Sequence, residues 1–345
     1  MKQYETDQRK ERFVLLVLGL LLVTAVLLSV CTGRYAVPVE KIPSLFWEYF
    51  TGNIKEADRT EITILFIVRI PRILLAILVG AALSISGAAY QGLFQNPMVS
   101  PDILGVSSGA SVGAALALLM KMDSGMVHIM AFVFGISAVL LVVTLANVIG
   151  KAGNRILIMV LAGTVISSIY SAFTSLMKYV ADPDEELPAI TFWLMGSFAK
   201  SGNYQNVKIL LVICVIAITL LMMVRWQINA LSFGEEEAMS LGVNVKRTRN
   251  IIIICSTLLT ASSVCICGTI GWVGLIMPHI TRFLVGPNYR ALFPTSMLMG
   301  ALFLLIVDNV SRVIIPGELP IGILTSLIGA PLFIYLLFKG RKEWT

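Results

Sequence analysis

Long runs of apolar residues recur along the whole chain, and short polar segments separate them. A helix of about 17–25 mostly apolar residues crosses the hydrocarbon core of a bilayer. The pattern predicts ten such helices, over residues 13–31, 73–90, 103–120, 126–148, 156–177, 207–224, 251–267, 272–285, 295–311 and 320–338. The eighth run is too short to span upright and contains Pro278, so we expect it to be broken or to end inside the protein.

The composition indicates an all-α, polytopic membrane protein. Of the 345 residues, 57% are hydrophobic and only 13% are charged, which excludes a water-soluble domain with a charged surface. We expect one transmembrane domain over residues 1–345, with a polar tail at 1–12 and another at 339–345. The first apolar run lacks a small-residue cleavage pattern, so we interpret it as a retained span rather than a signal peptide.

The distribution of lysine and arginine predicts the orientation, because these residues favour cytoplasmic segments. With a cytoplasmic N-terminus, fourteen of them lie in inner segments and ten in outer segments. An even number of spans places both termini on one side, and the basic segments KAGNR and KGRKEWT agree with that side being cytoplasmic. The net charge of +6 then reflects membrane topology and indicates no nucleic-acid partner.

The segment FIVRIPRILLAILVG places Arg69 and Arg72 beside a membrane span. An ionised guanidinium in hydrocarbon costs at least a few kcal/mol. The predicted topology has the chain enter the membrane from outside at this point, so both arginines are expected at the wet interface. Pro71 is tolerated there in a first helical turn. Simple snorkelling of the side chains toward water is the alternative to a functional role.

The segment GVSSG, residues 105–109, matches the pattern of a serine nucleophile elbow centred on Ser107. That chemistry needs a strained strand-to-helix turn, whereas this segment lies in a helical stretch. Glycines at 105, 109 and 113 form a smooth surface on which another helix can approach closely, so we favour helix packing by Gly105, Gly109 and Gly113. An intramembrane serine protease with a Ser107–His279 dyad stays open as an alternative.

Asp308 is the sharpest isolated polar signal, because it lies within the ninth span. Arg312 follows four residues later on the same helical face, which predicts a buried ion pair. A proton site in a secondary transporter is the alternative role for Asp308. Cys265 and Cys267 lack nearby His or carboxylate partners, so we predict buried thiols and no metal site. No nucleotide-binding P-loop motif occurs, so any ATP-driven motor must be another polypeptide.

The largest cytoplasmic loop, about residues 225–249, is predicted to contain two short helices that form a firm protrusion. Ser232 followed by Glu235 is a capping-box pattern, and the acidic residues 235–237 suit a helix N-terminus. Gly242 is a C-terminal stop, and Asn244 can start a second short segment. A rigid protrusion suits the transmission of force from a soluble partner, and a solvated loop is the alternative.

Six segments occurring in order resemble one known family. They are RIPR, GAALSISGAAYQGLFQNPMVSPDILGVSSGASVGAA, FGEEEAMSLGV, GTIGWVGLIMPHITRFLVGPNYRALFP, DNVSR and ELPIGILTSLIGAPLFIYLL. Together they are similar to the permease subunits of bacterial ABC importers for ferric siderophores, haem and cobalamin, the FecCD-type permeases of type II importers. The resemblance runs from about residue 13 to residue 338.

The resemblance implies a ten-span permease in the bacterial cytoplasmic membrane that is not itself an enzyme. Two permeases, identical or related, are expected to pair above two cytoplasmic ATPases, which bind ATP and Mg, and below an extracytoplasmic substrate-binding protein. No cofactor is expected in this chain. A ferric siderophore is the expected cargo, with haem and cobalamin as alternatives.

The resemblance also implies roles for particular residues. Arg69, Arg72 and Arg312 would receive glutamates of the binding protein, a task that suits the planar, permanently charged guanidinium. Asn96 and Pro97 match a position near the inner gate. The fifth span would line the pathway with Ser167, Ser168, Ser171 and Thr174, with small-residue packing as an equal alternative. The loop at about 232–247 would be the ATPase coupling element, with Ser232, Gly234, Glu235, Glu236, Glu237, Ala238, Leu241 and Gly242.

Overall fold

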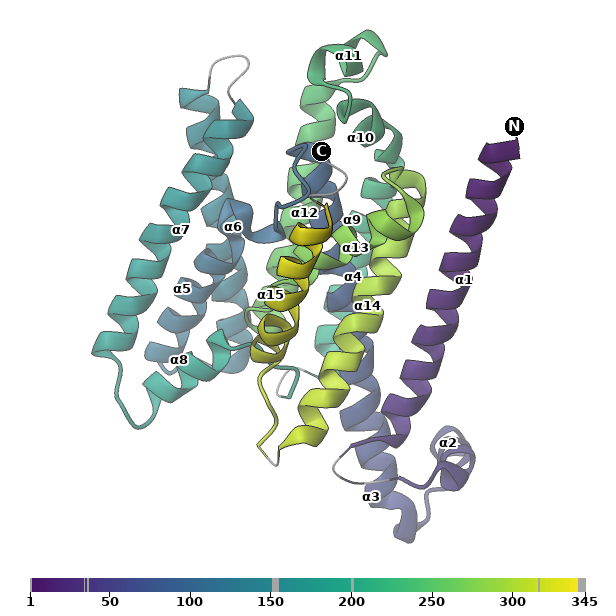
Figure 1. Ribbon diagram of the computed structural model, residues 1–345. Coiled ribbons are helices and arrows are strands. Elements are labelled where there is room, and N and C mark those ends of the chain that lie inside the picture. The colour runs from purple at the N-terminus through teal and green to yellow at the C-terminus, as the bar shows by residue number, and fades with distance from the viewer. Residues whose placement is uncertain are drawn as a thin grey trace.

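The computed structural model describes residues 2–33, 35, 37–150, 155–199, 202–315 and 317–340. Within those ranges every regular element is helical, in agreement with the predicted all-α class (Figure 1). Of the predicted C-terminal tail, residues 341–345 lie outside the described residues. Residues 2–12 of the predicted N-terminal tail are continuous with the first helix, which begins at Lys2.

Seven helical segments of the described chain are long and apolar enough to cross a membrane. They contain α1 (Lys2–Cys31), α4 (Ile70–Leu93), α6 (Ser124–Ile149), α7 (Arg155–Val180), α9 (Tyr204–Met223), α12 (Val245–Cys267) and α14 (Tyr289–Ile314). Three shorter apolar helices, α5 (Val106–Leu119), α13 (Val273–Val285) and α15 (Ile321–Gly340), occupy the other predicted spans. Each predicted span therefore coincides with a helix, and the count of ten membrane crossings stays a prediction.

The remaining elements are short and lie between these helices. They are η1 (Val39–Lys41), α2 (Ile42–Thr51), η2 (Glu56–Asp58), α3 (Arg59–Ile62), η3 (Thr63–Arg69), η4 (Pro101–Leu104), α8 (Glu186–Leu194), α10 (Arg225–Leu231) and α11 (Glu235–Ser240). Helix α13 contains Pro278 but stays continuous over its 13 residues. It begins after the non-helical residues 268–272, so this short run starts inside the protein rather than breaking in its middle.

Helix α4 forms the centre of the bundle, and most of its residues are buried. Gly80 of α4 crosses Gly300 of α14 so closely that a Cβ atom added at Gly80 would lie 2.3 Å from the Gly300 carbonyl oxygen. Such small-residue crossings bring the two backbones into van der Waals contact. Helix association in a membrane depends on this packing, because lipid tails are as apolar as the side chains and no hydrophobic effect drives the helices together. The core is therefore built around α4 and α14.

The helix that carries RIPR begins earlier than its sequence predicts. Helices α3, η3 and α4 are consecutive, and η3 is a π-helical segment in which the Ile70 N–H donates to the Leu65 carbonyl. Pro71 cannot donate to the preceding turn, and a π segment is one way for a helix to absorb such a defect. Because this rod starts at Arg59, Arg69 and Arg72 lie several turns inside it and not at its entry point.

The bundle has two distinct ends (Figure 1). Helices α10 and α11 lie at the same end as the start of α1, and we call this the α11 end. Helices α2, α3 and α8 lie at the opposite end, which we call the α3 end. The loop predicted to contact a soluble partner and the segment that carries RIPR therefore lie at opposite ends of the molecule.

Candidate functional site

A buried cluster of charges joins α4 to α14 near the α3 end. Arg72 donates from Nε to Oδ1 of Asp308 at 2.9 Å, and its Nη1 atom donates to Oε2 of Glu318 at 2.9 Å. Arg312 lies one turn after Asp308, with its Nε atom 3.2 Å from Oδ2. Asp308 is fully buried. Two guanidinium groups and two carboxylates thus share one site, and their charges balance.

Arg69 belongs to the same region but has different partners. Its Nη1 atom donates to the carbonyl of Val30 at 2.7 Å, and its Nη2 atom donates to the carbonyl of Tyr35. The carbonyls at the C-terminus of a helix carry partial negative charge, so the end of α1 is a favourable place for a guanidinium. Arg312 donates to Ser29 of α1 at 2.6 Å, so the arginines fasten α1 to the core.

The expectation that Arg69 and Arg72 remain at a wet interface is wrong for this structure. Their exposed fractions are 3% and 5%, and that of Arg312 is 6%. The physical reason is that Asp308, Glu318 and the last carbonyls of α1 accept hydrogen bonds from Arg72 and Arg69 inside the protein. Sequence reasoning had no signal for Glu318, Ser29 or Tyr35, because these partners are distant along the chain.

Ion pairs also fasten the short elements at the α3 end. Lys121, between α5 and α6, lies 2.9 Å from Glu185 and 3.4 Å from Glu186 at the start of α8. Hydrogen bonds to these carboxylates raise the pKa of Lys121, so its ammonium group stays charged to a higher pH than that of an isolated lysine. Lys41 similarly lies 3.1 Å from Glu61. Ion pairs therefore hold the short helices at the α3 end to one another and to the loop between α5 and α6.

At the α11 end, the predicted pair of short helices exists as α10 and α11. Helix α11 begins with the three acidic residues 235–237 and ends in a Schellman motif, in which Gly242 N donates to Met239 O and Val243 N donates to Ala238 O. Gly242 has a φ of 81° there, a conformation that favours glycine. The predicted acidic first turn and glycine stop are both present.

The predicted capping box is absent, and the start of the next helix differs as well. The N-cap of α11 is Gly234, and the Ser232 hydroxyl donates instead to the Asn229 carbonyl at 2.6 Å. Asn244 does cap a helix, because its side chain accepts from Arg247 N at 2.9 Å, but that helix is the long α12. The second short helix is therefore α10, which precedes α11 rather than following it.

A small apolar core holds this loop together, and it is built from Ala230, Leu231, Ala238, Val243 and Val245. Ala238 is fully buried in it, so this predicted coupling residue supports the loop from inside. An ion pair between Glu235 and Arg249 attaches α11 to α12.

The loop is also fixed to the rest of the bundle. Asn229 of α10 accepts from Tyr289 N at 3.0 Å, and it donates to Asn288 at 3.0 Å, at the start of α14. A displacement of the loop therefore acts directly on the ends of α12 and α14.

The outer surface of the α10–α11 loop is partly apolar. Phe233, Met239 and Leu241 are exposed to 74%, 56% and 57%, beside the exposed carboxylates of Glu236 and Glu237. Large apolar side chains that gather on a protruding loop indicate a contact with another protein. Phe233 and Met239 were not among the predicted coupling residues, and their exposure becomes visible only when the loop is folded.

The hydroxyl residues of α7 divide between two environments. Ser168 and Ser171 are exposed, and Thr164 and Ser175 extend them into one exposed polar stripe with helical spacing. Thr174 is buried and donates to the Tyr170 carbonyl at 3.1 Å, and Ser167 faces Gly105. Of the predicted four, Ser168 and Ser171 are exposed, Ser167 is half-buried and Thr174 is buried, and their role in the pathway stays a prediction.

The predicted gate residues lie in the turn that follows α4. Asn96 is exposed, and its side chain accepts from Met98 N at 2.9 Å, while Pro97 is half-buried. The neighbouring Gln95 donates to the Leu231 carbonyl of α10. This turn therefore contacts the α10–α11 loop directly.

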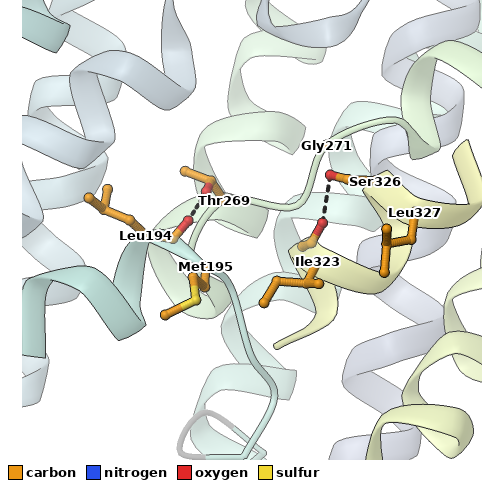
Figure 2. Close-up of a pocket in the computed structure, with 8 residues that line it drawn as sticks. Leu194, Met195, Thr269, Gly271, Ile323, Ser326 and Leu327 are labelled. Atoms are coloured by element: carbon orange, nitrogen blue, oxygen red, sulfur yellow. Dashed lines mark hydrogen bonds between the residues drawn. The ribbon is translucent and has the colours of Figure 1, made fainter. Parts of the chain in front are cut away.

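The chain leaves helical structure after α8, after α12 and before α15, and these three segments meet at one cavity of about 410 Å³ (Figure 2). The segment after α8 bonds to both others, since Ser197 N donates to Cys267 O at 2.8 Å and Gly322 N donates to Met195 O at 3.0 Å. Thr269 donates to the Leu194 carbonyl, and Ser326 donates to the Gly322 carbonyl at 2.7 Å. Non-helical backbone between apolar helices is tolerated where it is buried or lines a cavity.

Glycines at the start of α5 allow close helix packing. A Cβ atom at Gly113 would lie 2.2 Å from Met130 O of α6, and one at Gly109 would lie 2.5 Å from Phe134 O. Gly105 joins η4 to α5 and faces Ser167 of α7. These contacts agree with helix packing as the role of the GVSSG segment.

The alternative catalytic dyad is not assembled. Ser107 donates to Asp102, and in the described part of the chain no hydrogen bond joins it to His279. Nδ1 of His279 has no hydrogen-bond partner there, and its ring packs against Phe283. Cys265 and Cys267 are buried, and across the described ranges no group of three or more His, Cys, Asp or Glu could hold a metal ion.

The arrangement of these helices is that of a type II ABC importer permease. A solved structure described as a metal-chelate type ABC transporter in an inward-facing conformation matches with a TM-score of 0.83 and 39% identity, over 95% of this chain and 99% of that one. Residues 21–339 match the FecCD transport family. The chain belongs to this family, as its motifs predicted.

Relatives in the family carry names for different cargoes. The molybdate import system permease protein MolB of Haemophilus influenzae is 41% identical over 95% of this chain and 96% of its own length. A Helicobacter pylori protein named as a probable iron chelatin transport system permease is 40% identical over 86% of this chain and 90% of its own. Others are named for cobalamin, hemin and Fe(3+)-citrate import. The chain is thus an integral membrane permease of an ABC importer.

Proposed function

We propose that this chain forms the membrane pathway of an importer for a ferric siderophore or a related metal chelate, driven by separate ATPase subunits. The match to the FecCD family across residues 21–339 is the observation that carries the proposal. The chain contains no P-loop motif, so ATP and Mg would be bound by the partner ATPases. We place the protein in a bacterial cytoplasmic membrane with the α11 end and both termini inside.

In this proposal the α10–α11 loop receives the force from the ATPase. Its internal apolar core keeps it rigid, and Phe233, Met239 and Leu241 would insert into the partner. Because the loop bonds to α12 and α14, a shift driven by nucleotide binding would tilt these helices. ATP hydrolysis would supply the free energy of each cycle, and the different affinity of the ATPases for nucleotide in their two states would convert it into this shift.

The pathway would run past the exposed stripe of α7 and the cavity beside α15. The hydroxyls of Thr269 and Ser326 already donate within the chain, so the cavity offers few unsatisfied polar groups. Such a surface suits a bulky chelate that must pass without being held tightly. A second permease, identical or related, would form the opposite wall.

The extracytoplasmic binding protein would dock at the α3 end. Glu318 is half-buried, lies on Arg72 and adopts a φ of 58°, which is unfavourable for a non-glycine residue. We propose that a carboxylate of the binding protein displaces Glu318 from Arg72, with Arg69 and Arg312 as its neighbours. This would use the arginines without requiring them to be exposed beforehand.

A second cargo has specific support. MolB, named for molybdate, is 41% identical to this chain, which is as close as its iron-named relatives. Molybdate is therefore the second candidate cargo, ahead of haem and cobalamin, which the sequence resemblance also allowed.

Reconstituted transport tests both levels of the proposal. The permease is co-purified with the ATPase and binding protein encoded beside it and placed in liposomes, and uptake of ⁵⁵Fe-siderophore, haem, cobalamin and ⁹⁹Mo-molybdate is measured with and without ATP. We expect uptake of the ferric chelate that requires ATP and the binding protein.

Two other outcomes would contradict the proposal at different levels. Uptake of molybdate alone would retain the importer and change the cargo. Uptake driven by a proton gradient without the ATPase would instead support a secondary transporter that uses Asp308.

A further inference from the structure

A second cavity, of about 610 Å³, lies between α6, the start of α7 and the first half of α12. It is remote from the charge cluster at the α3 end and from the cavity beside α15, and none of the roles proposed above uses it. Its volume falls within the range of about 300–1,000 Å³ that is usual for ligand sites. Leu140 and Ile254 on its two sides are 61% and 58% exposed, so it is a groove that opens sideways.

The groove changes from polar to apolar along its length. On α12 it is lined first by Lys246 and Asn250 and then by Ile253, Ile254, Thr257 and Leu258. Thr257 contributes little polarity, because its hydroxyl lies 3.0 Å from the Tyr90 hydroxyl in a hydrogen bond.

Helix α6 shows the same change in the opposite chain direction. It contributes Asn147 at the polar end and Val143, Leu140, Val139 and Ile136 beyond it. The polar ends of α6 and α12 therefore coincide at the α11 end of the bundle.

The groove has the length of one membrane leaflet. From Lys246 to Leu258 it follows α12 for about 18 Å at the rise of an α-helix. Half of a bilayer hydrocarbon core is about 15 Å. An occupant of this groove would therefore have a polar head at the surface of the bilayer and an apolar body that reaches toward its middle.

The polar end carries an excess of positive charge. Arg155 and Lys246 line it, and Arg249 interacts electrostatically with Arg155. Glu235 is the carboxylate that acts on Arg155, and it is already paired with Arg249. The Nε atom of Arg155 is buried and has no hydrogen-bond partner in the described part of the chain. Asn147 and Asn250 add neutral amide donors beside these cations.

We propose that this groove binds an anionic phospholipid, with its phosphate at Arg155 and Lys246 and one acyl chain along α6 and α12. Charge complementarity and the polar-to-apolar change both favour an amphiphile over a soluble anion, which would leave the apolar part unused. The same features favour a lipid over a second copy of the chain. A second copy would bring its own two cations to the groove and no free carboxylate to neutralise them.

A bound lipid would link α6 and α7 to the start of α12, the helix that follows the α10–α11 loop. Lipid composition could therefore change how firmly the loop is coupled to the bundle. The binding itself requires only the folded, membrane-embedded chain and does not depend on which cargo is transported.

Lipid binding to the purified full-length chain tests the proposal. Thermal unfolding in detergent is followed while dioleoyl phosphatidylglycerol, dioleoyl phosphatidylcholine or glycerol phosphate is titrated in. We expect phosphatidylglycerol to raise the unfolding temperature at lower concentration than phosphatidylcholine, and glycerol phosphate to have no effect. With about 1 kcal/mol for each cation near an anionic lipid, Arg155→Gln with Lys246→Gln should weaken phosphatidylglycerol binding about thirtyfold.

Two further variants make the result specific to the groove. Val143→Phe, which fills the apolar part, should weaken the binding of phosphatidylglycerol while keeping both cations. Arg290→Gln removes an exposed cation at the α11 end outside the groove and should bind as the parent does. Unfolding temperatures without lipid show whether each variant is folded, and Val143→Phe carries the test if the double variant is not.

Three results would overturn the proposal. Equal stabilisation by phosphatidylglycerol and phosphatidylcholine would show that the two cations do not select the lipid. Stabilisation by glycerol phosphate that is unchanged in Val143→Phe would show that the groove binds only an anion. Disulfide-linked dimers formed through Ile254→Cys, beyond those of the parent chain, would show that a second copy covers the groove.

Discussion

At the α3 end, the side chains of Arg72, Arg312, Asp308 and Glu318 form a neutral cluster inside a membrane bundle. Removing one partner of a buried ion pair costs about 3–5 kcal/mol, because the other charge is left uncompensated. The Asp308–Arg312 spacing could be recognised in the sequence as two residues on one helical face. Arg72 and Asp308 are separated by 236 positions, so their contact depends on how α4 packs against α14.

Glu318 and Arg72 give opposite predictions for docking of the binding protein. Glu318→Gln should strengthen docking several-fold, because it removes the internal competitor for Arg72. Arg72→Gln should weaken docking at least tenfold, within the cost of about 2–5 kcal/mol for truncating one partner of a buried charge pair. Binding of the purified binding protein to the permease in nanodiscs measures both affinities.

Asp308→Asn neutralises the other carboxylate partner of Arg72. It should therefore also strengthen docking, while the unfolding temperature falls because Arg72 and Arg312 are left uncompensated in the free permease. Equal affinities of the Glu318→Gln and Arg72→Gln variants for the binding protein would show that Glu318 does not compete with it for Arg72.

At the scale of elements, local sequence signals determine where α11 begins its acidic turn and where it ends, and packing determines which of its side chains are exposed. Its acidic first turn and its stop at Gly242 follow from local chemistry and were predictable. The cap at Ser232 was wrong because Ser232 ends the preceding α10 and bonds back to Asn229. The apolar core of the loop, Ala230, Leu231, Ala238, Val243 and Val245, then decides which side chains face outward.

The exposed face of the loop predicts where the ATPase binds. Phe233→Ser with Met239→Ser should leave the stability of the bundle within about 0.5 kcal/mol, because both side chains are exposed. The same variant should reduce co-purification of the ATPase at least tenfold, since it removes the apolar anchors of the contact. Quantitative pull-down of a tagged permease measures this loss.

Tyr179→Ser serves as the matched control, because Tyr179 is an equally large exposed side chain near the opposite end, 87% exposed. It should co-purify the ATPase as the parent does. If the loop variant also retains the ATPase, another surface makes the contact.

The whole molecule separates two chemistries along one axis. The α11 and α3 ends lie at opposite ends of the bundle (Figure 1). The α11 end carries an apolar and acidic protrusion, and the α3 end carries the buried arginine cluster. Such a separation suits a protein that contacts a motor on one side of a membrane and a substrate carrier on the other. It also makes the predicted orientation directly testable.

Labelling with a membrane-impermeant maleimide tests the orientation. Asp184→Cys and Ser240→Cys place exposed thiols at the α3 and α11 ends. In cells whose outer barrier is open but whose cytoplasmic membrane is intact, Asp184→Cys should react at once and Ser240→Cys only after permeabilisation. The parent chain, whose cysteines are buried or half-buried, measures the background. Reaction of both thiols from one side would rule out the proposed topology.

The sequence alone determined the class of this protein, the positions of its ten apolar helices and the acidic loop helix, because hydropathy and helix stops depend on residues that are close along the chain. It also determined the family, because the order of short motifs along the chain can be recognised without the fold. The tertiary structure decided that Arg69 and Arg72 are buried, that Phe233 and Met239 protrude, and that α6 and α12 form a groove between them. These features depend on contacts between helices far apart in sequence, and packing rather than local pattern selects those contacts.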